Sequence, residues 1–246
     1  MSKHRFSSWV AWRLPLSKAE SVRPNQRMKR IYLILVDFVL PLPMTALIYW
    51  LWYRRTGSQL FPAYTLTLGV LFGYIFPGIG TNVFHLWKFN GPFKMGNYFI
   101  HHGFMYAPYL ALVFYVAFPA GAPLTVGNIV RILISAGFIQ CVLSCHHDTW
   151  GVATGMIEIA SSPGTGNLSP VETVTRFGLV GFWLAGATYS ASCLFAYRAI
   201  VVNAQSNGMT FVILLAIGLA LMSIAALQYA FGQRALLLGF TRKVKL

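Results

Sequence analysis

The sequence has few acidic residues and few charged residues of either sign. Only five Asp and Glu occur among 246 residues, and charged side chains make up 10% of the chain. Soluble domains usually contain about a quarter charged residues, so this composition excludes an ordinary soluble domain. Together with 57% hydrophobic and 15% aromatic residues, it predicts an all-α integral membrane protein, because helices satisfy their own backbone hydrogen bonds in lipid.

Several motifs of other protein classes are also missing. The three cysteines, Cys141, Cys145 and Cys193, lie in apolar segments without a CxxC pair, so a disulfide framework is not expected. No GxxxxGK[ST] phosphate loop, HxxxH or HExxH motif, tandem repeat or heptad array occurs. So little sequence lies outside the hydrophobic segments that we expect one helical bundle and no separate soluble domain.

Six hydrophobic segments are long enough to cross a bilayer, which takes roughly 20 residues per crossing. We place these spans near 31–53, 62–86, 98–118, 128–150, 174–198 and 209–232. The predicted organisation is a basic cytoplasmic or interfacial segment over 1–30, a polytopic bundle of about six helices over 31–240 and a basic cytoplasmic tail over 241–246.

The distribution of basic residues predicts the orientation of this bundle. With the N-terminus in the cytoplasm, fifteen of the nineteen Lys and Arg fall inside, eight of them in residues 1–30. The four left outside are Arg54, Arg55, Arg131 and Arg198. Because cytoplasmic loops are enriched in Lys and Arg, we expect a multi-pass protein with both termini cytoplasmic. The same rule accounts for the formal charge of +14, so the lipid bilayer and not a nucleic acid is the expected partner.

A stripe of small and polar residues runs along residues 131–158. If the fourth helix continues past the bilayer surface, residues at steps of three and four share one side of it. Polar groups left unsatisfied in hydrocarbon are costly, so this side is expected to face partner helices or an internal cavity. The stripe contains Gly137, Gln140, Ser144, His147, Gly151, Thr154 and Glu158.

Histidines and carboxylates gather at the cytoplasmic ends of the predicted spans. His85 ends the second span, His101 and His102 begin the third, and His146, His147 and Asp148 end the fourth. On the same side, Asp37 lies six residues into the first span, about 9 Å deep at 1.5 Å per residue. Ionisable residues within a membrane usually mark functional sites, so we predict one site where these ends meet.

Two kinds of chemistry fit this set of residues. Asp37, His147, Asp148 and Glu158 are the candidate catalytic residues, because a carboxyl group in an apolar setting can act as a general acid with histidine as its partner. His85, His101, His102 and His146 are the candidate metal ligands, since zinc and iron bind imidazole together with carboxylate. Iron or zinc is the first cofactor candidate, and haem b, held by histidines of two spans, is the second.

The leading hypothesis is a membrane enzyme that modifies a hydrophobic lipid or isoprenoid substrate from the cytoplasmic leaflet. Its chemistry is metal-assisted or general acid/base, and oxygenase, cyclase and transferase reactions stay open. One alternative is a haem- or quinone-binding subunit of a redox complex, which would have membrane partners. Another is a small-molecule transporter or a membrane assembly factor, because broken helices often form transport sites.

Overall fold

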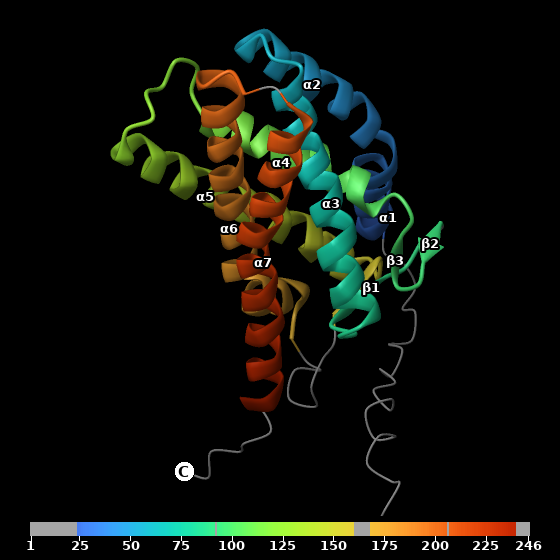
Figure 1. Cartoon of the computed structure of the whole chain (residues 1–246). Coiled ribbons are helices and arrows are strands. Elements are labelled where there is room, and N and C mark those ends of the chain that lie inside the picture. Colours follow the sequence, from blue (N-terminus) through green and yellow to red (C-terminus); the bar gives the residue numbers. More distant parts are fainter. Residues whose placement is uncertain (1–23, 92, 160–167, 206, 240–246) are drawn as a thin grey trace, which may run out of the picture.

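The computed structural model describes residues 24–91, 93–159, 168–205 and 207–239, so the predictions for residues 1–23 and 241–246 lie outside the described residues. Helices dominate this part of the chain, and four short strands lie among them (Figure 1). In chain order the elements are α1 (Pro24–Ile34), η2 (a π-helix, Leu35–Val39), α2 (Pro41–Thr56), α3 (Leu60–Asn82), β1 (Trp87–Phe89), β2 (Lys94–Met95), β3 (Tyr98–Phe99), α4 (His102–Ala117), α5 (Val126–Ala153), β4 (Ile157–Ile159), α6 (Pro170–Ala196), η3 (a π-helix, Tyr197–Val202) and α7 (Gly208–Gly239).

Several of these helices are long and apolar enough to cross a membrane. Within the described ranges there are four, at Leu60–Asn82, Val126–Ala153, Gly178–Val202 and Gly208–Phe231. The bent pair Arg27–Val39 and Pro41–Thr56 makes a fifth if it is one span. The multi-pass helical class is thus supported, whereas the count of six and the side of the termini stay predictions. The predicted third span forms only the 16-residue α4, about 24 Å long against a hydrocarbon core of about 30 Å.

The predicted first span is broken in the middle. Its two parts meet at 53°, and the π-helix η2 ends the first part, with Leu40 N donating to Leu35 O at 2.8 Å. Pro41 follows directly and has no N–H to continue the ladder, which is a common cause of a sharp helix kink. The break therefore leaves backbone carbonyls of η2 without partners inside their own helix.

The helices pack closely where small residues meet. A Cβ atom on Gly69 of α3 would lie 2.6 Å from Ala107 Cα of α4, and one on Gly137 of α5 would lie 2.7 Å from the Trp183 ring of α6. Small residues at crossings let helix backbones approach in lipid, where packing replaces the hydrophobic effect as the source of association. The core next to these contacts is aromatic and includes Trp52, Phe61, Tyr64, Phe114 and Tyr189.

Short strands accompany the predicted helical bundle, and they correct one expectation drawn from the sequence. β1 pairs with β4 in antiparallel register and β2 pairs with β3. The helix of the fourth span does not continue to Glu158. It ends at Ala153, where Gly155 takes φ +71° and its N–H donates to Val152 O. A glycine in this left-handed conformation is a common helix stop, and the next residues turn back into β4.

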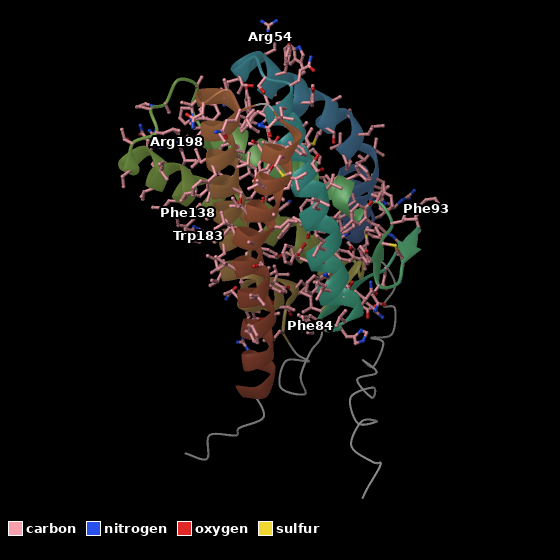
Figure 2. The ribbon with its side chains drawn as sticks, in the orientation of Figure 1. Arg54, Phe84, Phe93, Phe138, Trp183 and Arg198 are labelled. Atoms are coloured by element: carbon pink, nitrogen blue, oxygen red, sulfur yellow. The ribbon has the colours of Figure 1, made fainter. Side chains whose placement is uncertain are left out.

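The two ends of the bundle carry different residues and strands. Figure 2 places Arg54 and Arg198 toward one end and Phe84, just beyond α3, at the other. Strands β1 and β4 lie near the end marked by Phe84, as Figure 1 shows for β1. Because the C-terminal part of α5 precedes β4 directly, the predicted histidines and carboxylates of the fourth span lie near this end as well.

Candidate acid–base site between two cavities

Three of the predicted catalytic residues are joined by hydrogen bonds. The His147 ring nitrogens Nε2 and Nδ1 lie 2.8 Å from Asp37 Oδ1 and 2.9 Å from Asp148 Oδ1. The Asp37 side chain is only 3% exposed, whereas those of His147 and Asp148 are 21% exposed. Carboxylates only accept hydrogen bonds, so a doubly protonated His147 donates to both. The result is a continuous carboxylate–imidazole–carboxylate series from η2 to α5.

The break before α2 places Asp37 in this series. Leu40 N already bonds to Leu35 O and Pro41 has no N–H, so the carbonyls of Val36 and Asp37 need hydrogen-bond donors from elsewhere. Helix α4 and its N-cap residue provide the donors: Tyr109 Oη donates to Val36 O at 2.7 Å, and His101 Nε2–H donates to Asp37 O at 3.1 Å. π-helical turns are frequent at functional sites, and here the turn points the Asp37 carboxylate at α5.

A large apolar cavity borders the outer end of this series. Its volume is about 330 Å³, within the range typical of small-molecule sites. The residues that line it come from α3, α4, α5, α6, α7, β1, β4 and the turn after α3, and include Phe72, Phe76, Trp87, Phe89, Tyr106, Phe182 and Tyr229. Of the described residues in this lining, Asp148 is the only one with an acidic or basic side chain. The cavity therefore has one carboxyl group in a lining that is otherwise mainly apolar.

A second cavity lies on the other side of the series. It has a volume of about 100 Å³ and is lined by parts of α1, η2, α4 and α5, with Asp37, His147 and Asp148 all in its wall. Tyr106, Gln140, Ser144 and Asp148 line both cavities. The polar stripe predicted on α5 thus faces the interior at Gln140, Ser144 and His147, and Gln140 Nε2 donates to Ser144 Oγ at 2.7 Å.

The paired strands β1 and β4 form one wall of the large cavity. Alternate residues of a strand point to opposite faces, and Trp87, Phe89, Ile157 and Ile159 all line the cavity. Glu158 lies between the two isoleucines, and it contacts residues of β1 and the adjoining loop in place of Asp37 or His147. Its carboxylate lies 2.8 Å from Lys88 Nζ and accepts a hydrogen bond from Asn90 at 2.5 Å. The structure therefore does not bring this predicted catalytic residue into the series.

The four predicted metal ligands are placed separately. His85 donates from Nδ1 to Thr81 O at 3.2 Å, and His101 donates to the Asp37 carbonyl. His146 packs against Tyr32 and Trp150. His102 is fully buried among aromatic rings, and neither of its ring nitrogens has a hydrogen-bond partner. These histidines meet neither each other nor a shared carboxylate.

No group of three or more His, Cys, Asp or Glu side chains that could hold a metal occurs within the described ranges. The reason lies in local partners: each histidine at a helix end either satisfies a nearby carbonyl or packs on rings, and His147 directs both nitrogens at carboxylates. The haem-site prediction, which needs two converging imidazoles, stays a prediction. Sequence reasoning missed the apolar wall from β1 and β4, although the alternation in Trp87-Lys88-Phe89 and Ile157-Glu158-Ile159 carries its signal.

Comparison with known proteins finds that no family model, no curated protein and no solved structure matches this chain.

Proposed function

We propose that this chain is an integral membrane enzyme that performs general acid/base chemistry on a hydrophobic lipid or isoprenoid substrate. The observation that carries this proposal is the position of Asp148, whose carboxyl group lines the apolar cavity and bonds to His147 at 2.9 Å. A substrate held in the cavity would meet Asp148 as its nearest acidic or basic side chain. The distribution of Lys and Arg favours access from the cytoplasmic leaflet.

Each residue of the series has a distinct role in this proposal. Asp148 exchanges the proton with the substrate and is the catalytic residue. His147 fixes the orientation of the Asp148 carboxyl group and can share its proton, and the buried Asp37 holds the imidazole from the other side. A carboxylate that orients a histidine through one nitrogen is a recurrent arrangement in acid/base sites. The aromatic rings of the cavity suit an isoprenoid chain and can stabilise positive charge that develops on it.

The test uses the full-length protein in lipid nanodiscs, incubated with a total membrane lipid extract and followed by mass spectrometry. We expect a lipid species to be converted by the wild type, and conversion to fall by about 10²–10⁴-fold in Asp148→Asn, which removes the acid/base group. Glu158→Gln is the matched control, because it neutralises a carboxylate outside the cavity lining. Equal product patterns for wild type and Asp148→Asn would refute the proposal.

A further inference from the structure

The smaller cavity differs from the larger one in what surrounds it. Ionisable or hydroxyl groups reach it from every element of its wall: Tyr32 of α1, Asp37 of η2, Tyr106 and Tyr109 of α4, and Ser144, His147 and Asp148 of α5. A cavity holds water when it is polar and offers more than about 10–15 Å³, with several hydrogen-bonding partners. At about 100 Å³, this cavity has room for a few water molecules.

The hydrogen-bonded series leads from the smaller cavity to the larger one. Asp37 and His147 line only the smaller cavity, whereas Asp148 lines both. The two links of 2.8 Å and 2.9 Å are short enough for proton transfer without movement of the backbone. A proton taken up in the smaller cavity thus has a path to Asp148 at the larger cavity, whose lining is mainly apolar.

We propose that the smaller cavity is a water-filled chamber and that Asp37 and His147 relay protons between its water and Asp148. The step starts from the tautomer in which the Nε2 proton of His147 lies on Asp37 Oδ1. That proton moves back to Nε2 while the proton on Nδ1 moves to Asp148 Oδ1, and Asp37 then regains a proton from chamber water, so one proton enters the series and one arrives at Asp148. His147, which also lines the chamber, returns to its starting tautomer by giving its Nε2 proton to chamber water and taking one at Nδ1. Run backwards, the same path removes a proton that Asp148 has taken from a substrate. The relay rests on the proposed function, because it presumes that Asp148 exchanges protons in the larger cavity.

The presence of water is tested first, without any substrate. Hydroxyl-radical footprinting of the full-length protein in nanodiscs oxidises methionines that contact water. Met105 lines the smaller cavity although it is only 4% exposed, and Met222 is 0% exposed and lines neither cavity. We expect Met105 to be oxidised severalfold faster than Met222, and Leu110→Phe or Leu143→Phe, which fill the chamber, to remove the difference. Equal rates for the two methionines in the wild type overturn the water-filled chamber.

The relay is tested with 5-nitrobenzisoxazole, an apolar probe that opens when a base removes its ring C–H proton. The N–O bond breaks, a nitrile and a coloured phenolate form, and the proton stays on Asp148. We expect a rapid burst of one phenolate per protein, then slower turnovers limited by proton release. Leu110→Phe should keep the burst and slow the later turnovers severalfold, and Asp37→Asn should slow the later turnovers more than the burst.

The outcomes separate the relay from the proposed function. A burst unchanged in Asp148→Asn counts against the proposed function. The relay is overturned, and the proposed function stands, if Asp148→Asn loses the burst while neither Leu110→Phe nor Asp37→Asn slows the later turnovers. A wild type without a burst overturns the relay too, because proton release then limits nothing.

Discussion

Removing the hydroxyl group of Tyr109 tests whether α4 holds the broken first span in place. The Tyr109 hydroxyl donates to Val36 O at 2.7 Å, and this carbonyl has no donor from its own helix, because Leu40 N bonds to Leu35 O and Pro41 has no N–H. Leaving a carbonyl without its partner costs about 1–3 kcal/mol when it is buried. Water from the adjoining cavity can partly replace the hydroxyl, so we expect Tyr109→Phe to lower the free energy of unfolding by about 1–2 kcal/mol.

The assay is the unfolding of the purified protein in mixed micelles as the mole fraction of denaturing detergent rises, followed by far-UV circular dichroism. Tyr49→Phe is a matched control with the same chemical change. The Tyr49 hydroxyl donates to Gln59 O at 3.5 Å in an exposed position, so its loss should change the free energy of unfolding by less than about 0.5 kcal/mol. If Tyr109→Phe destabilises the protein no more than Tyr49→Phe does, α4 does not support the break and the account of how Asp37 is placed is wrong.

Three further predictions concern stability. Arg55 donates at 2.7 Å and 3.1 Å to carbonyls at the end of α4 and stacks on a tyrosine, so Arg55→Met should cost about 1–3 kcal/mol in the same detergent titration. A side chain at Gly137 would meet the Trp183 ring, so Gly137→Leu should cost about 1–3 kcal/mol or more and lower the thermal midpoint. Hydrogen bonds from the Ser169 hydroxyl and backbone lower the pKa of Glu172. A lowered carboxyl pKa stabilises the fold above the unfolded pKa, so Glu172→Gln should have a lower thermal midpoint than the wild type at neutral pH. This difference should disappear in acid, where Glu172 of the wild type is protonated.

The placement of His101 shows how one pattern supports different roles. From the sequence, adjacent histidines at a helix start suggest ligands or catalytic groups. In the structure, His101 Nε2–H bonds to the carbonyl that Pro41 leaves without a partner, and the ring lies flat on Phe99 at 5.5 Å. Its contribution is therefore structural, since it fixes the backbone of Asp37. His102, one residue later, points about 100° away around the helix and is buried among rings instead.

The sequence alone determined the membrane class and most of the residues at the site. Low charge, apolar segments and small residues at helical spacing are local properties, and each can be read in one window of the chain. The stripe on α5 was predicted correctly as far as Gly151, which packs on Ile157. The sequence predicts that Asp37, His147 and Asp148 share one site, but it does not predict the direct hydrogen bond between Asp37 and His147, which are 110 positions apart.

Tertiary structure decided which of the candidates meet. Asp37 reaches His147 only because the first span breaks at Pro41 and α4 satisfies the freed carbonyls. Glu158 leaves the series because Gly155 ends α5 and a strand then directs that side chain toward Lys88. Such contacts depend on where helices cross and which backbone groups need partners, and these are properties of the packed bundle that no single segment encodes.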